Sequence, residues 1–194
     1  MSSPILVGGL TSFLFYFLVV YLPARKKHRI VKANLKQQYA DVKKEILYQI
    51  IFASREGGRT DLVASPKTVE QLSTVDGFRL AFQDGESSTE GFYAFSNYIN
   101  SEEATHIFEC IVLNLRVLSK QIDFVLHNYP ITDKYVFDVF KNLELVLIHI
   151  DTLKPGDYYD AKNLSSFLYS VFAGFSIIEG KLDYDVIEKM IEEM

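Results

Sequence analysis

Residues 101–129, SEEATHIFECIVLNLRVLSKQIDFVLHNY, carry the clearest structural signal in the chain and decide the fold class. Apolar side chains recur every three or four residues from Ile107 to Leu126, which is the period of a helix with one buried face. Pro130 follows directly and ends the pattern, because proline cannot continue a helix. This stretch therefore predicts a long amphipathic helix.

The chain beyond Pro130 repeats the helical pattern twice. A second helix is expected from a Thr132 cap to about Leu153, and a third from near Asp160 to Ile178. The third segment contains a run of 16 uncharged residues with several serines, which is too short and too polar for a membrane span. We therefore expect it at the centre of a helical bundle.

A short terminal helix is expected after an Asp183 cap. Its acidic side chains predict a solvated face or, alternatively, a surface for a partner. These residues are Asp183, Asp185, Glu188, Glu192 and Glu193.

The pattern is less uniform before the long helix. Apolar residues at helical spacing from Ile30 to Ser54 predict an amphipathic stalk helix, and Ser65 followed by Pro66 predicts the start of a short helix. Residues 74–92 fit a short helix plus a loop, with a small hairpin as the alternative. The fold class is therefore all-α, with a bundle of about four to six helices.

The N-terminal segment has the composition of a membrane anchor. Residues 1–24 contain no charged side chain, and Ile5–Leu22 is an 18-residue apolar run. That length is close to the minimum for crossing a hydrocarbon core of about 30 Å. We expect a single transmembrane helix that ends at Pro23. A cleaved signal peptide is the alternative, but its basic region would precede the apolar run.

Positive charge is concentrated directly after this segment. Positively charged flanks remain on the cytoplasmic side of a membrane, which predicts an outside N-terminus and a cytoplasmic C-terminal domain at the inner or plasma membrane. The same side chains are expected to contact anionic lipid headgroups. This basic collar consists of Arg25, Lys26, Lys27, Arg29, Lys32 and Lys36.

The charge distribution divides the remainder of the chain. Residues 25–59 carry a formal charge of +7 and residues 60–194 carry −12. A nucleic-acid surface needs a concentrated basic face, so the acidic part argues against a nucleic-acid partner. We expect a transmembrane anchor over 1–24, a basic juxtamembrane stalk over 25–59 and an acidic all-α cytoplasmic domain over 60–194.

Small residues at four-residue spacing in the anchor suggest self-association. Gly8 and Ser12 fall on one helix face together with Pro4, and such faces let membrane helices approach closely.

Catalytic motifs are absent from the sequence. It contains no G-x-G-x-x-G, no G-x-x-x-x-G-K-[ST], no H-E-x-x-H and no G-x-S-x-G pattern. We therefore expect a protein that is not an enzyme and has no cofactor. His106, Cys110 and His149 are weak candidates for a metal or thiol–imidazole site, if the helices before and after Pro130 form a hairpin.

These observations favour a membrane-anchored interaction or regulatory protein, an adaptor or sensor at the cytoplasmic membrane face. Its expected partners are the anionic bilayer and either another protein or a second copy. The first alternative is an oligomerising membrane effector that perturbs the bilayer through Gly8 and Ser12. A bundle metalloenzyme is the second alternative.

Overall fold

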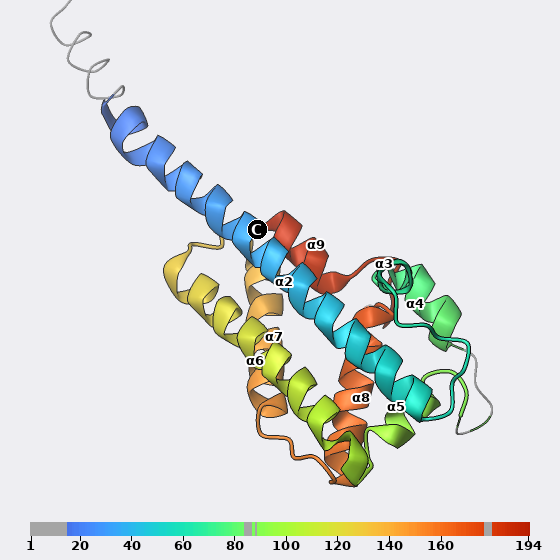
Figure 1. Ribbon diagram of the computed structural model, residues 1–194. Coiled ribbons are helices and arrows are strands. Elements are labelled where there is room, and N and C mark those ends of the chain that lie inside the picture. Colours follow the sequence, from blue (N-terminus) through green and yellow to red (C-terminus); the bar gives the residue numbers. More distant parts are fainter. Residues whose placement is uncertain (1–14, 84–86, 88, 177–179) are drawn as a thin grey trace, which may run out of the picture.

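The computed structural model describes residues 15–83, 87, 89–176 and 180–194, and it is helical apart from one short pair of strands. The elements follow in the order η1, α2, α3, α4, α5, η2, α6, α7, α8, β1, β2 and α9. Figure 1 shows α2 as a long helix, with the other helices of the chain packed along its C-terminal part. The predicted all-α class is confirmed.

The central element is α2, which spans Leu22–Glu56 and is about 52 Å long at 1.5 Å per residue. Its buried residues begin at Leu35 and recur at helical spacing to Ser54. The helix contacts α5, α6 and α9 along this part. Most of the predicted stalk, from Leu35 onward, therefore contributes to the bundle core.

Pro23 does not end the helix at the N-terminal side. A π-helical turn, η1 (Phe17–Tyr21), leads directly into α2, and the Leu22 N–H donates to the Phe17 carbonyl. Proline removes one backbone donor and its ring crowds the preceding turn, and a widened turn relieves that crowding. The expectation of a break at Pro23 is therefore wrong, since the chain remains helical through it.

The long helix and its successor form the expected hairpin. α6 spans Thr105–Asn128, preceded by the 3₁₀ turn η2 (Glu102–Ala104), and α7 spans Lys134–Ile150. The two helices pack along each other beyond the turn at Pro130. The cap of α7 is Asp133 rather than Thr132, because its carboxylate accepts the Val136 N–H at 3.1 Å.

α8 is shorter than the sequence indicates. It spans Tyr158–Phe172 and is followed by β1 (Phe175–Ser176), which pairs antiparallel with β2 (Gly180–Lys181). Gly174 turns the chain with φ +64°, and a Cβ there would lie 2.7 Å from the Leu182 carbonyl oxygen. The expected continuation to Ile178 is therefore wrong, and Ile178 itself lies outside the described residues.

One short helix occupies the first part of residues 74–92, the region that the sequence leaves ambiguous, and a second follows that region. α4 spans Val75–Phe82 and α5 spans Tyr93–Tyr98, while residues 84–86 and 88 lie outside the described part. α3 spans Pro66–Leu72, with Ser65 as its cap as predicted. The choice of helix over hairpin is thus settled for residues 75–82.

The last helix, α9, spans Val186–Glu193. Its cap is Asp185, not Asp183, and the Asp185 carboxylate accepts the N–H groups of Ile187 and Glu188. Ile187, Met190 and Ile191 are buried against the rest of the bundle. The acidic helix is therefore amphipathic and only its outer face is solvated.

Of the predicted membrane segment, residues 1–14 lie outside the described part, and with them Gly8 and Ser12. Among the helices of the described residues, none combines the length and the apolar character needed to cross a membrane. η1 buries none of its side chains, and Phe15, Leu18 and Val19 are each more than half exposed.

Candidate functional site

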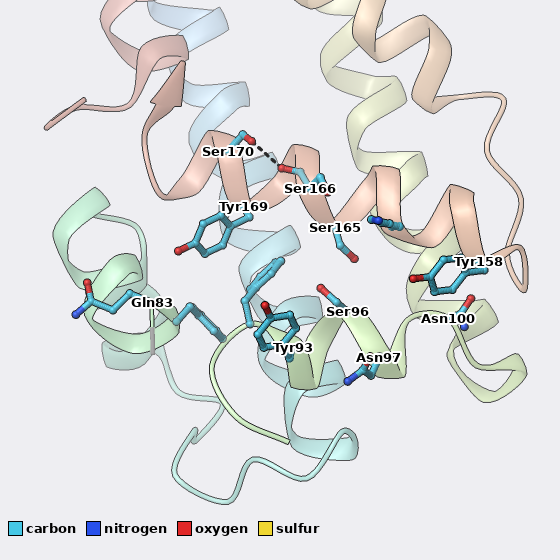
Figure 2. A pocket seen from close by; sticks show the side chains of 13 residues that line it. Gln83, Tyr93, Ser96, Asn97, Asn100, Tyr158, Ser165, Ser166, Tyr169 and Ser170 are labelled. Atoms are coloured by element: carbon cyan, nitrogen blue, oxygen red, sulfur yellow. Dashed lines mark hydrogen bonds between the residues drawn. The ribbon is translucent and has the colours of Figure 1, made fainter. Parts of the chain in front are cut away.

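A pocket of about 610 Å³ opens between α5 and α8 and is closed at one end by the last residues of α4 (Figure 2). Its size falls within the range of small-molecule sites. The lining is mixed, with aromatic rings, hydroxyl groups, side-chain amides and one ammonium group. The residues are Phe82, Gln83, Phe92, Tyr93, Ser96, Asn97, Asn100, Tyr158, Lys162, Ser165, Ser166, Tyr169 and Ser170.

Helical periodicity explains why these side chains share one pocket. On α8 the lining residues run from Tyr158 through Lys162 and Ser165 to Tyr169, at steps of four, three and four. Residues at this spacing lie on one face of a helix. The facing wall uses the same spacing from Tyr93 to Asn100, at and beyond α5.

One end of the pocket is aromatic. The ring centroids of Phe92 and Tyr169 are 5.2 Å apart, and those of Phe82 and Phe92 are 5.4 Å apart. Phe78 lies behind them, with its centroid 6.1 Å from that of Tyr169. These contacts anchor the rings in the core, so this end presents a preorganised surface suited to a flat apolar group.

The lining of the pocket contains two buried polar atoms, one on Ser165 in its middle and one on Asn100 beside Tyr158 (Figure 2). Within the described residues, neither Ser165 Oγ nor Asn100 Oδ1 has a hydrogen-bond partner, although both atoms are buried and Ser165 is only 4% exposed. In Figure 2 the hydroxyls of Ser165 and Ser96 point toward each other across the space between the helices. An unpaired buried hydroxyl or amide costs about 1–3 kcal/mol, so the pocket is prepared for a polar ligand or for water.

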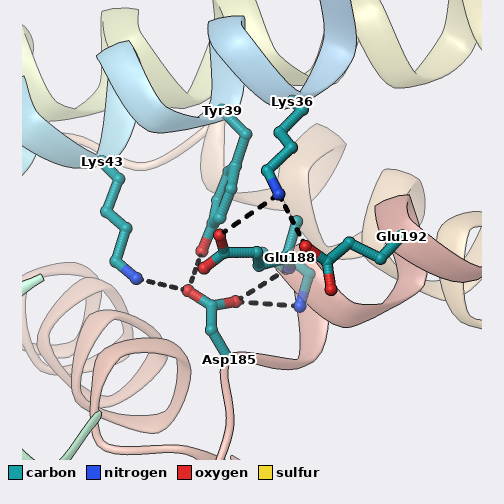
Figure 3. A network of polar contacts seen from close by, with 7 residues as sticks. Lys36, Tyr39, Lys43, Asp185, Glu188 and Glu192 are labelled. Carbon is teal, nitrogen blue, oxygen red and sulfur yellow. Dashed lines mark hydrogen bonds and ion pairs between the residues drawn. The ribbon is translucent and has the colours of Figure 1, made fainter. Parts of the chain in front are cut away.

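A second polar cluster joins α9 to α2 (Figure 3). Asp185 Oδ2 accepts hydrogen bonds from the Tyr39 hydroxyl at 2.6 Å and from Lys43 Nζ at 2.7 Å. Its other oxygen accepts the N–H groups of Ile187 and Glu188 at 3.0 and 3.1 Å. All three side chains are buried, so this is a fully paired internal charge rather than a solvated acidic face.

Burial keeps the Tyr39 hydroxyl of this cluster protonated. Burial, together with the neighbouring Asp185 carboxylate, raises the pKa of the Tyr39 hydroxyl well above its ordinary value. Tyr39 therefore remains a neutral donor to Asp185.

The outer part of the same interface is exposed. Lys36 Nζ contacts Glu192 Oε1 at 2.6 Å and Glu188 Oε1 at 4.0 Å. The hydrogen bond to Glu192 raises the pKa of Lys36 and lowers that of Glu192. Lys32 donates to the Glu192 carbonyl oxygen, and His28 Nε2 lies 2.9 Å from the backbone oxygen of Met194. The end of α9 thus lies along the basic part of α2.

The predicted basic collar is therefore divided between two environments. Lys32 and Lys36 contact α9, and Lys27 Nζ lies 5.4 Å from the ring centroid of Tyr129 at the α6–α7 turn. Arg25 and Arg29 are exposed, and within the described chain they have no ion-pair partner.

The predicted metal candidates do not form one site. His106 and Cys110 lie one turn apart on α6, with Sγ 3.7 Å from Nε2, in the range of a weak thiol hydrogen bond. His149 is exposed on α7. No group of three or more His, Cys, Asp or Glu side chains among the described residues is arranged to hold a metal ion.

Neither the pocket nor the Asp185 cluster is among the sites predicted from the sequence. The spacing of Tyr158, Lys162, Ser165 and Tyr169 is a readable signal for the pocket, because it places polar groups on one face of a helix that carries no charge after Lys162. The Asp185 cluster has no comparable signal, since Tyr39 and Asp185 are 146 residues apart.

Comparison of the chain with protein-family models, with curated proteins and with solved structures gives no significant match.

Proposed function

We propose that this chain is a single-pass membrane-anchored helical protein that acts at the cytoplasmic membrane face as an interaction or regulatory module. The observation that carries the proposal is the segment 15–22, a helical run whose large apolar side chains are all exposed beyond the bundle. Exposed contiguous apolar surface of this kind is typical of a segment that meets a membrane or a partner. In the sequence, Ile5–Leu22 is an uncharged apolar run of 18 residues, which is close to the minimum spanning length.

The position of the basic collar supports a membrane as the surface that this segment meets. Arg25 follows Leu22 by three residues, and Arg29 is one helical turn further along. Cations at this distance from an apolar helix lie at the level of lipid phosphates, and their sign favours the cytoplasmic leaflet. The acidic bundle begins next to them, where Lys27 contacts Tyr129 and His28 contacts Met194, and most of it extends away from the negative surface.

The character of the inter-helix pocket supports a binding role for the bundle. Its lining offers hydroxyl, amide and aromatic groups, which are the groups that orient small ligands. A bundle with such a pocket, held at a membrane, is suited to an adaptor or a sensor.

Washing membranes with alkaline carbonate tests whether the N-terminal segment anchors the chain in the bilayer. We expect the full chain, expressed in a bacterial host, to remain in the membrane pellet after washing with alkaline carbonate. Two substitutions, Leu10→Lys and Leu14→Lys, are expected to release it, because they lie near the middle of the run Ile5–Leu22 and each charge at the middle of a spanning helix costs about 2.5–3.5 kcal/mol. The matched control is Leu113→Lys, which changes an apolar side chain of α6 that is 53% exposed.

The control variant should remain in the pellet like the unmodified chain. Complete release of the unmodified chain by carbonate would contradict the anchor. So would retention of the Leu10→Lys/Leu14→Lys variant.

A further inference from the structure

The pocket between α5 and α8 carries information about its ligand beyond its size. Lys162 is the one charged side chain in the lining, and no carboxylate accompanies it. Within the described residues Lys162 takes part in no ion pair. Aromatic rings alone would suit a cation as well as a neutral ring, but the ammonium group of Lys162 disfavours a cation. The charge of the lining therefore favours a ligand with one anionic group.

The order of the side chains along α8 fixes where each part of such a ligand would lie. Tyr169 belongs to the aromatic end, and Lys162 lies seven residues earlier, about 10 Å along the helix axis. Ser165 lies between them, with its buried hydroxyl unpaired. A matching ligand has a flat ring at one end, hydrogen-bonding groups in the middle and an anion at the other end.

The two buried polar atoms of the lining indicate which hydrogen-bonding groups the ligand carries. Asn100 Oδ1 accepts hydrogen bonds only, and Ser165 Oγ both accepts and donates. Sugar hydroxyls and the amino groups of a base are donors that would satisfy these atoms. Aromatic side chains such as Tyr169 and Phe92 stack on any base with little regard to its identity.

We propose that this pocket binds a nucleoside 5′-monophosphate, with the base against Phe92 and Tyr169, the ribose near Ser165, and the phosphate at Lys162. This proposal does not depend on the membrane anchor. Failure of either experiment leaves the other unaffected, because carbonate extraction does not report on the pocket and ligand binding does not report on the anchor.

The test measures binding of the 5′-monophosphates of adenosine, guanosine, cytidine and uridine to the full chain in detergent micelles, by calorimetry. At least one of them is expected to bind with a Kd below about 1 mM. The corresponding nucleoside should bind about tenfold more weakly than its monophosphate. In Lys162→Gln the two should bind equally, because the side chain that recognises the phosphate has been removed. Lys162 is exposed, so this variant is expected to fold normally.

A pair of serine variants separates a ligand-binding role from a structural one. Ser165→Ala and Ser54→Ala each remove a buried hydroxyl that has no partner in the part of the chain that the structure describes. Ser54 lies in α2 and is not among the residues that line the pocket. Both are expected to raise the melting temperature, because an unpaired buried polar group is removed and alanine favours a helix. Only Ser165→Ala should weaken nucleotide binding, by several-fold.

The proposal is overturned if none of the four monophosphates binds at millimolar concentration. It is also overturned if one binds but neither Lys162→Gln nor Ser165→Ala changes its affinity, because the ligand then lies elsewhere.

Discussion

The carboxylate of Asp185 shows how one residue can connect two distant parts of a chain. Its two oxygens accept four hydrogen bonds, two from side chains of α2 and two from the first turn of α9. Every acceptor position of the carboxylate is therefore used, which is the condition under which a buried charge is tolerated. The same carboxylate therefore caps α9 and forms the buried ion pair with Lys43.

Replacement of Asp185 by alanine is expected to destabilise the fold by about 3–5 kcal/mol, because Lys43 is left buried without its counter-charge and α9 loses its cap. The free energy of unfolding from chemical denaturation measures the loss. Asp138→Ala is the matched control, since Asp138 is exposed on α7 and takes part in no ion pair within the described residues. It should change stability by less than about 1 kcal/mol. Equal effects of the two substitutions would show that the Asp185 cluster contributes nothing to stability.

The raised pKa of Tyr39 predicts that the free energy of unfolding depends on pH in the alkaline range. Its pKa in the folded protein is raised above the ordinary value of 10.0, mainly by burial. Below that ordinary value the hydroxyl is protonated in both states and its contribution to stability is complete. As the pH rises further the unfolded chain loses this proton first, so the free energy of unfolding falls until the raised pKa is passed.

Tyr39→Phe should therefore be less stable at neutral pH, because the hydrogen bond to Asp185 is lost, and should show a shallower decline above about pH 10. Denaturation curves of the variant and the unmodified chain across this range provide the comparison. Parallel declines would contradict the assignment of a neutral, buried Tyr39.

At the scale of elements, the contact between α2 and α5 depends on a glycine. A Cβ at Gly57 would lie 2.2 Å from the Ala94 carbonyl oxygen, which is too close for the two helices to remain in place. Gly57→Ala should cost about 2–3 kcal/mol, within the usual range for overpacking. Gly156 provides the control, because it has φ +79° and nothing lies within 4 Å of its Cβ position.

Gly156→Ala should cost only the strain of a left-handed backbone, about 1–2 kcal/mol. A thermal shift assay under identical conditions ranks the two variants. A smaller loss for Gly57→Ala than for Gly156→Ala would contradict the close approach of α2 and α5.

The helices could be predicted from the sequence because their evidence is local. The 3.6-residue pattern gives the hairpin of α6 and α7 around Pro130, and Ser65–Pro66 gives the start of α3. The errors lie at the ends of elements. α8 ends at Phe172 because Gly174 turns the chain toward Leu182, and that close approach involves residues far from the helix pattern.

The candidate site, too, could be predicted only where its evidence is local in the sequence. Spacing along α8 shows that Lys162, Ser165 and Tyr169 share a face, but not that Asn100 and Phe92 lie opposite them. The caps at Asp133 and Asp185 each lie close to the expected ones, because Thr132 and Asp183 are equally good candidates by residue type. Pairing between residues far apart in the chain, such as Lys43 and Asp185, cannot be recognised from periodic spacing in the sequence.

At the scale of the whole molecule, the proposed function joins three regions in order along the chain. An exposed apolar helix precedes a basic collar, and the collar precedes an acidic bundle with a pocket. This order places the bundle in the cytoplasm, next to the membrane, if the anchor spans the bilayer. The side of the membrane on which the bundle lies is therefore the central claim.

The single cysteine of the chain allows this claim to be measured directly. Cys110 lies on α6 in the bundle and is partly exposed. In right-side-out spheroplasts a membrane-impermeant maleimide should leave Cys110 unlabelled until detergent is added. The variant Ser3→Cys/Cys110→Ser, which moves the thiol to the other side of the proposed anchor, should be labelled without detergent. Labelling of Cys110 in intact spheroplasts, with protection of the N-terminal thiol, would contradict the proposed orientation.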